Sequence, residues 1–338
     1  MITEAKKELI FLENKDFETC HASTICVLKN GSILVTWFAG ATEGADDVAI
    51  WSACRSNGVW SIPQKIADDP GQPNWNPVLY VLDNGNVMMF YKVGRNISSW
   101  VTKVIISKDD GKTWSEPVEL VPGDASGGRG PVRNKVIKLS NGNILAPAST
   151  ENGIWKCFAD IYCPSDKTWT KSEEIQIKNL DYENIQSVKS NIAVSQQSFK
   201  GKGVIQPTLW ESAPGIVHML MRSTEGKIFR SDSKDYGVTW SDAYATVLPN
   251  NNSGIDVARM ENGILALVYN PVGVNWGERT PIALSISRDN GLSWGKDFIL
   301  DKGEGEFSYP AIIAQNNELL ITYTFNRKSI AFWNITLK

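Results

Sequence analysis

The sequence predicts an all-β fold, a six-bladed β-propeller whose blades are four-stranded and antiparallel. Two observations predict it: a hairpin-like pattern occurs six times along the 338 residues, and a turn pattern ending in tryptophan recurs out of phase with it. In addition, no long segment shows the 3.6-residue apolar period of a helix. Repetition of this kind indicates a repeat architecture.

The first repeat is a tight hairpin. In "VLKNGSILVTW" (residues 27–37), apolar residues alternate on both sides of Asn30-Gly31, a pair that suits a two-residue turn. Related segments follow about 50 to 75 residues apart, with their turns at Asn84-Gly85, Asn141-Gly142, Gly215, Asn262-Gly263 and Asn316-Asn317. Each hairpin is expected to supply two strands of one blade.

The second repeat has the frame S-x-D-x-G-x-S/T-W at residues 107–114, 233–240 and 287–294, and eroded copies end at Trp60 and Trp169. In this frame the Asp can accept hydrogen bonds from turn amides, and the Gly can adopt a positive φ. The Trp can pack between blades. One hairpin of each kind per unit predicts four strands per blade.

The closure of the propeller is expected to involve both ends of the chain. After Trp294 only about one blade's length remains, so the strand "KKELIFL" (residues 6–12) should complete the last sheet. This closure would remove an exposed edge strand, which otherwise invites aggregation. A closed array uses residues 1–338 as a single domain.

The composition excludes several classes of function. The net charge is −3 and no basic run or stripe occurs, so nucleic acid is not an expected partner. No apolar run is long enough to span a membrane, and the N-terminus lacks the pattern of a secretory signal, which predicts a cytoplasmic protein unless the sequence is trimmed from a secreted one. Five cysteines without a C-x-x-C pair and only two histidines predict free thiols and no metal or organic cofactor.

A binding site is expected at one end of the central channel, where the innermost strands of all blades begin. These strands start near "CHAST", "NWNPV", "RNKVI", "IQPTL", "GIDVA" and "SYPAI". The polar side chains that would converge there are His21, Asn76, Asn134 with Lys135, Gln206, Asp256 and Tyr309. The pattern favours a polar ligand.

The frames, the inner-strand pattern and their order resemble the sialidase (neuraminidase) superfamily, and more closely its BNR/Asp-box exo-sialidase-like members. The resemblance covers essentially the whole chain. It implies three arginines that bind the substrate carboxylate, a Tyr–Glu pair that supplies the nucleophile, and an Asp in an early loop as acid/base. Tyr309 matches the nucleophile, and Arg222 and Arg279 match the second and third arginines by their spacing from the Asp boxes.

Two positions depart from the family pattern. His21 stands where the first arginine is expected, and one imidazole cannot form the bidentate fork of a guanidinium on a carboxylate. Gln206 stands near the place of the activating Glu. A tyrosine without a base beside it is a poor nucleophile at neutral pH, so Asp256 from the next inner strand is the predicted substitute.

The acid/base is expected in the loop "GATEGADDVAIW", where Glu43, Asp46 and Asp47 are all candidates and Glu43 and Asp47 are the favoured ones. Trp75 and Asn76 at the second blade, Asn134 and Lys135 at the third, and Glu151 after a returning strand are the further expected ligand contacts. Residues of these types also occur for structural reasons alone, the tryptophans in core packing and the asparagines in turns.

The resemblance predicts an exo-acting glycoside hydrolase that removes a terminal acidic sugar, sialic acid or a relative, from a glycan. In that hypothesis Arg222 and Arg279, with His21, bind the anionic group, and Tyr309 stabilises or attacks the anomeric carbon. Two alternatives stay open. One is a glycan-binding propeller without catalysis, and the other is a lyase or hydrolase that acts on a glycan containing uronic acid.

Overall fold

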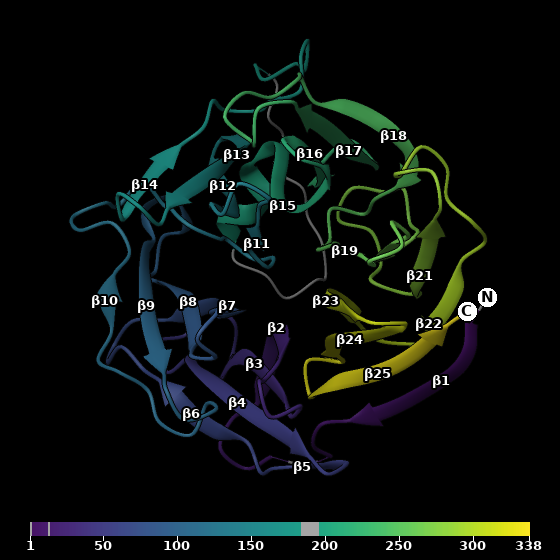
Figure 1. Cartoon of the computed structure of the whole chain (residues 1–338). Helices are drawn as coiled ribbons and strands as arrows, with labels where there is room; N and C mark the ends of the chain where they lie inside the picture. Colours follow the sequence, from purple (N-terminus) through teal and green to yellow (C-terminus); the bar gives the residue numbers. More distant parts are fainter. Residues whose placement is uncertain (1, 13, 184–195) are drawn as a thin grey trace.

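Antiparallel sheets surround a central axis in the computed structural model, which describes residues 2–12, 14–183 and 196–338 (Figure 1). The only helices among these residues are two short 3-10 turns, η1 (Ile97–Ser99) and η2 (Gln196–Lys200). The predicted all-β class and the propeller arrangement are therefore confirmed. Within the described ranges, no helix has the length and apolar character that a membrane span requires.

The first half of the described chain forms three groups of strands in chain order. The first is β2 (Thr19–Val27), β3 (Ile33–Gly40), β4 (Ala49–Ser56), β5 (Val59–Trp60) and β6 (Gln64–Ala67). The second is β7 (Asn74–Val81), β8 (Val87–Val93), β9 (Val101–Ser107) and β10 (Val118–Glu119). The third is β11 (Ile137–Lys138), β12 (Ile144–Asn152), β13 (Ile154–Cys163) and β14 (Thr168–Lys171).

The second half continues in the same way. It contains β15 (Lys202–Ala213), β16 (Ile216–Ser223), β17 (Lys227–Ser233) and β18 (Tyr244–Pro249). These are followed by β19 (Asp256–Arg259), β20 (Leu265–Tyr269), β21 (Ile282–Ser287) and β22 (Phe298–Asp301). The last strands are β23 (Phe307–Gln315), β24 (Glu318–Phe325) and β25 (Ser329–Leu337).

The sheet count differs from the prediction of six separate four-stranded sheets. The described strands form five hydrogen-bonded sheets, of which three have four strands, one has five and one has eight. The eight-stranded sheet arises because β13 and β15 pair in parallel over Ile154 with Lys202 and Trp155 with Gly203. This short contact joins two groups of antiparallel strands.

The two ends of the chain close the ring, as predicted. β1 (Ile2–Leu9) pairs antiparallel with β25, with Ala5 opposite Ile335, in the sheet that also contains β24 and β23. The two termini accordingly lie side by side at the rim (Figure 1). The N-terminal strand thus covers the edge that β25 would otherwise expose.

The Asp-containing frames form compact turns between neighbouring groups of strands. In residues 233–240, Asp235 Oδ1 accepts hydrogen bonds from the Thr239 amide at 2.9 Å and from Ser233 Oγ at 2.8 Å. Gly237 has a φ of +85°, and a Cβ there would lie 2.9 Å from Leu145 of β12. Trp240 is half-buried and packs against the hydrophobic cluster that contains Leu145. The frame therefore packs one group of strands against the next.

Four inner strands, β2, β7, β15 and β23, are bulged near the channel end. At each bulge one non-glycine residue has a positive φ: Ala22 (57°), Asn76 (43°), Gln206 (49°) and Tyr309 (53°). Such a backbone costs about 1 to 3 kcal/mol per residue and is typical of functional sites. Bulges also redirect side chains, so the regular alternation of side chains between the two sheet faces is interrupted at these four positions near the axis.

Candidate active site

Tyr309 lies at the centre of a cluster of cationic side chains. Its phenolic oxygen accepts a hydrogen bond from Arg222 Nη1 at 2.6 Å. The guanidinium carbons of Arg133, Arg222 and Arg279 lie 5.4, 5.6 and 5.2 Å from the centre of its ring, and the His21 ring centre lies at 4.2 Å. The structure therefore brings together Tyr309, Arg222, Arg279 and His21, as the sequence predicts.

A narrow pocket opens beside this cluster. Its lining includes Tyr309 and Arg222, the two carboxylic acids Glu43 and Glu151, three tryptophans (Trp75, Trp100 and Trp276), and the predicted contacts Asn76 and Gln206. Its free volume of about 20 Å³ is enough for about one water molecule. A sugar that enters must displace some of these side chains.

Arg222 is the arginine of this pocket whose hydrogen bonds go to neutral groups. Besides the phenol, its Nη1 donates to Gln206 Oε1 at 2.9 Å and its Nε donates to Asn252 Oδ1 at 3.0 Å. Only 2% of the residue is exposed, so its charge is removed from bulk water. A buried cation without a counter-charge suits an anionic ligand.

Arg279 belongs to an ion-pair cluster that begins beside the Tyr309 ring. Its Nη1 donates to Glu306 Oε1 at 2.7 Å, while its buried Nη2 has no hydrogen-bond partner among the described residues. Arg327 also pairs with Glu306, through Nε at 2.8 Å, and reaches Glu43 Oε2 through Nη1 at 2.6 Å. Burial acts to raise the pKa of Glu306, but Arg279 and Arg327 outweigh it and hold the pKa well below its ordinary range.

Arg327 and Glu306 are site residues that the sequence reasoning missed. Arg327 lies between β24 and β25 with a φ of 53°, and Glu306 directly precedes β23. The available signal was positional, because a turn between the middle strands of the last blade returns to the channel end where Tyr309 begins its strand. Arg327 holds the Glu43 side chain at the pocket.

His21 does not replace the charge of the missing arginine. It is 2% exposed, its Nδ1 shares a hydrogen bond with Thr324 Oγ1 at 2.9 Å, and its Nε2 has no partner among the described residues. Burial, together with the nearby charge of Arg327, holds the pKa of His21 well below 6.5. The ring is therefore expected to be neutral at neutral pH and does not supply the charge of the missing arginine, while its contact with the substrate anion stays a prediction.

Asp256 lies in a different network from the one predicted. Its carboxylate accepts hydrogen bonds from Lys135 Nζ at 2.8 and 2.9 Å, from Thr208 Oγ1 at 2.6 Å, and from the amides of Val257 and Ile312 at 3.0 and 2.9 Å. Among the hydrogen bonds of the described residues, none joins it to the phenol of Tyr309. The predicted Asp256–Tyr309 contact is therefore wrong, and both oxygens serve to tie inner strands together.

Lys135 and Asn134 are also structural in this arrangement. Lys135 Nζ completes its bonding with the carbonyl of Val257 at 2.7 Å. Asn134 Nδ2 donates to the carbonyls of Gln206 at 3.1 Å and Pro207 at 2.9 Å, at the β15 bulge. The neighbouring Arg133 does the same at the β23 bulge, donating to the Tyr309 and Pro310 carbonyls at 2.5 and 2.7 Å. These side chains support the bulges and do not line the pocket.

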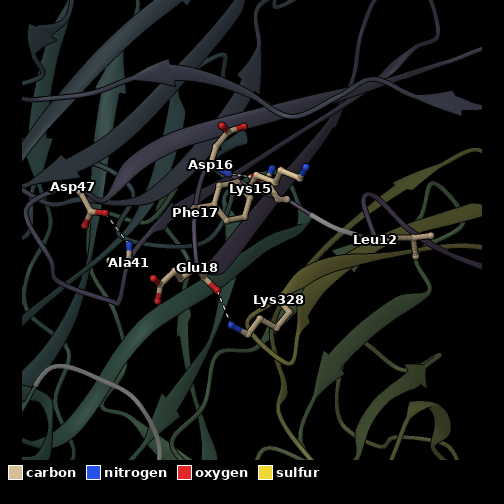
Figure 2. Close-up of a pocket in the computed structure, with 9 residues that line it drawn as sticks. Leu12, Lys15, Asp16, Phe17, Glu18, Ala41, Asp47 and Lys328 are labelled. Carbon is tan, nitrogen blue, oxygen red and sulfur yellow. Dashed lines mark hydrogen bonds between the residues drawn. The ribbon is translucent and has the colours of Figure 1, made fainter.

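The three acids of the early loop diverge. Asp46 forms an exposed ion pair with Arg95 at 2.7 Å. Glu43 lines the narrow pocket, whereas Asp47 accepts the Ala41 amide at 2.9 Å and faces a wider pocket of about 780 Å³. Figure 2 shows that wider pocket, where Lys328 donates to the Glu18 carbonyl and Lys15 and Phe17 complete the wall. Among the described residues its lining includes no arginine and no tyrosine, so the narrow pocket is the candidate site despite its smaller size.

The remaining predicted contacts, Trp75 and Glu151, both line the narrow pocket. Trp75 lines the pocket, with its Nε1 donating to the Gly94 carbonyl at 2.9 Å and its ring beside Trp100. Glu151 is half-buried, and burial raises its pKa to about 7, with Arg222 lowering it and Glu43 raising it. Across the described ranges there is no group of three or more His, Cys, Asp or Glu residues that could hold a metal ion.

Several solved structures are similar to this chain. A protein of unknown function from Dyadobacter fermentans has a TM-score of 0.76 at 16% identity, covering 100% of this chain and 99% of that one. The Hadza microbial sialidase Hz136 has a TM-score of 0.74 at 16% identity, covering 95% and 66%. NanB sialidase from Streptococcus pneumoniae has a TM-score of 0.72 at 13% identity, covering 97% and 70%.

The Trypanosoma rangeli sialidase, solved with the inhibitor DANA, has a TM-score of 0.70 at 15% identity, covering 99% of this chain and 60% of that one. At these identities the likeness shows a common fold. The model of the BNR repeat-like domain family matches residues 31–321, which is most of the chain. The protein therefore belongs to the BNR repeat-like domain family.

Proposed function

We propose that the protein is an exo-acting glycoside hydrolase that removes a terminal acidic sugar, sialic acid or a related sugar, from a glycan. The observation that carries the proposal is the contact of Tyr309 with Arg222. It places a phenolic oxygen 2.6 Å from a buried guanidinium, in a pocket that also contains two carboxylic acids. In sialic acid the carboxylate is attached to the anomeric carbon, and this pocket places a possible nucleophile beside a cation.

The roles follow from the contacts. Arg222 binds the sugar carboxylate, and Arg279, whose Nη2 has no partner among the described residues, lies with its guanidinium carbon 5.2 Å from the Tyr309 ring centre. Arg222 also stabilises negative charge that develops on the phenolic oxygen as Tyr309 attacks or shields the anomeric carbon. Protonation of the leaving oxygen falls to Glu43 or Glu151, which line the pocket.

We also propose that the propeller has six blades when the eight-stranded sheet is counted as two. Supporting this count, that sheet consists of β11–β14 and β15–β18, and only two residue pairs join them. The innermost strands of the six blades would then be β2, β7, β11, β15, β19 and β23.

A second candidate function is glycan binding without catalysis. Gln206 occupies the position where the family resemblance implies an activating Glu, and its neutral amide cannot act as a base for Tyr309. Asp256 is already paired with Lys135. Loss of the base with retention of Arg222 would preserve affinity for an acidic sugar and abolish turnover.

A panel of glycans separates the functions. Each glycan carries a terminal sialic acid, another acidic sugar or a neutral sugar, and the products are separated by mass spectrometry. Release of an intact acidic sugar supports hydrolysis, and an unsaturated product that absorbs in the ultraviolet supports elimination. Saturable binding without either product supports the binding module.

A further inference from the structure

Glu151 differs from the other acids around Tyr309 in having no hydrogen-bond or ion-pair partner within the described part of the chain. It lies near the end of β12, opposite Trp155 of β13, and lines the pocket together with Tyr309 and Arg222. Among the described residues its carboxyl group makes no hydrogen bond and no ion pair. By contrast, Glu43 is paired with Arg327 and Glu306 with both Arg279 and Arg327.

An acid that is already bound by a guanidinium is a poor proton donor, because its charged form is the one that the pair stabilises. The family resemblance directs attention to the early loop, where Glu43 has such a partner. Glu151 comes from a different part of the propeller and has no cation bonded to it. Among the described residues, the pocket therefore holds one ion-paired carboxylate, Glu43, and one unpaired carboxyl group, Glu151. Acid catalysis needs a carboxyl group of the second kind, which can stay protonated until it donates.

Resting on the proposed function, we propose that Glu151 is the acid of this site. It donates its proton to the glycosidic oxygen as the bond from that oxygen to the anomeric carbon breaks and its electron pair stays on the oxygen. Water then adds to the anomeric carbon, and the proton that the water loses returns to the Glu151 carboxylate. Overall, one water is consumed and one acidic sugar and one alcohol are released.

The charges around Glu151 support a protonated carboxyl group in the resting enzyme. Burial raises its pKa to about 7; the charge of Arg222 acts against this, and the charge of Glu43 acts with it. Cys157 on the adjacent β13 has a pKa well above its ordinary value because it is buried, so it adds no charge. Tyr309 is the remaining ionisable group of the pocket lining.

The other neighbours contribute little. Lys156 of β13 donates to Glu174 at 2.8 Å and is committed to that pair. The turn η1, which packs against β12, contains Ile97 and two serines and has no ionisable side chain. The pKa of Glu151 is therefore set mainly by its burial and by the charges of Arg222 and Glu43.

The decisive variant is Glu151→Gln, with Glu173→Gln as the matched control because Glu173 is exposed and outside the pocket. Two substrates are compared, sialic acid linked to lactose and sialic acid linked to an acidic phenol. Glu151→Gln should reduce turnover of the lactose-linked substrate at least about a hundredfold. The phenol-linked substrate should be affected far less, because its leaving oxygen needs no proton. Glu173→Gln should resemble the wild type on both.

A second readout does not need activity. Because the pKa of Glu151 is raised from 4.5 to about 7 in the folded state, its contribution to stability is lost as the pH rises from about 4.5 to about 7. The melting temperature of Glu151→Gln relative to the wild type should therefore rise over this range and level off above it. A constant difference would overturn the proposal, since Glu151 would then not be protonated in the resting state.

The outcomes separate this proposal from the proposed function. If the wild type releases no acidic sugar, the hydrolase assignment fails and the acid role fails with it. If the wild type is active and Glu151→Gln retains its activity on the lactose-linked substrate, only the assignment of Glu151 is overturned. An equal loss on both substrates would also overturn it, because that result indicates a structural role.

Discussion

Arg222 Nη1 and the phenolic oxygen of Tyr309 are 2.6 Å apart, although 87 residues separate them in the sequence. Arg222 lies next to the last residue of β16 and Tyr309 lies at the bulge of β23, so the contact joins two different sheets of the propeller. In the proposed function this contact marks the side of the pocket that binds the anion, which makes Arg222 the first residue to test.

Arg222→Ala should weaken binding of free sialic acid about ten- to a hundredfold, because a charge-assisted hydrogen bond contributes roughly 1.5 to 3 kcal/mol. Binding of a neutral sugar should change little. Titration calorimetry on both ligands measures the two affinities. Arg288→Ala is the control, since Arg288 is an exposed arginine of the third Asp box. Equal weakening for the acidic and the neutral sugar would argue against a carboxylate at Arg222.

The stability of the protein should fall as the pH drops below 6.5, in part because of His21. Its folded-state pKa is held well below 6.5 by burial and by Arg327, so only the unfolded chain binds a proton at this imidazole. Each such proton removes about 1.4 kcal/mol of stability per pH unit. His21→Gln should therefore have a flatter stability profile between pH 6.5 and 5.

Denaturant titrations at several pH values test this, and comparison with the wild type cancels the opposite contribution of Glu151. An unchanged slope in His21→Gln would mean that His21 is protonated in the folded protein. At lower pH, below the ordinary value of 4.5, protonation of Glu306 should add a second loss, because its folded-state pKa is well below that value.

Asp256→Asn should destabilise the fold strongly. The substitution leaves the Lys135 ammonium without its counter-charge and weakens bonds to Thr208 and to the Ile312 amide. Breaking a buried pair on one side costs about 3 to 5 kcal/mol. Replacing both partners, Asp256→Asn with Lys135→Met, should recover part of the loss. A stable Asp256→Asn variant with turnover reduced a hundredfold would restore the catalytic role that the sequence predicts.

Trp240→Ala should lower the melting temperature and leave ligand preference unchanged. Trp240 is half-buried beside Leu145 and its Nε1 donates to the Gly237 carbonyl at 2.8 Å, in the second Asp box. We expect a cost of about 3 kcal/mol, the lower end of the range for truncating a large aromatic side chain. Calorimetric melting gives the first quantity and the ratio of affinities for acidic and neutral sugars gives the second. A changed ratio would connect the box to the pocket.

The architecture was accessible from the sequence because it depends on local patterns. The Asn-Gly turns and the frame around Asp235, Gly237 and Trp240 specify hairpins and their packing within a few residues. The same frames locate Arg222 and Arg279 by spacing. The parallel contact of β13 with β15 has no such signal, because it depends on how two neighbouring groups of strands approach each other.

The partners of the charged residues could not be predicted in this way. Arg327 reaches Glu43 across 284 residues, and Lys135 reaches Asp256 across 121. Which guanidinium meets which carboxylate depends on side-chain directions at the bulged strands, and a shift of one residue changes the face on which a side chain lies. The prediction for Asp256 failed at this level, because the start of its strand was placed correctly and its side-chain partners were not.

The account is tested most directly by measuring the release of sialic acid from an aryl α-glycoside by the wild type and by Tyr309→Phe. The wild type should release the intact acidic sugar. Tyr309→Phe keeps the ring beside the arginines but lacks the oxygen that Arg222 contacts, so its turnover should be lower by at least about a hundredfold. Equal release by the two proteins, or no release by a wild type that binds sialic acid, would contradict hydrolysis at this pocket.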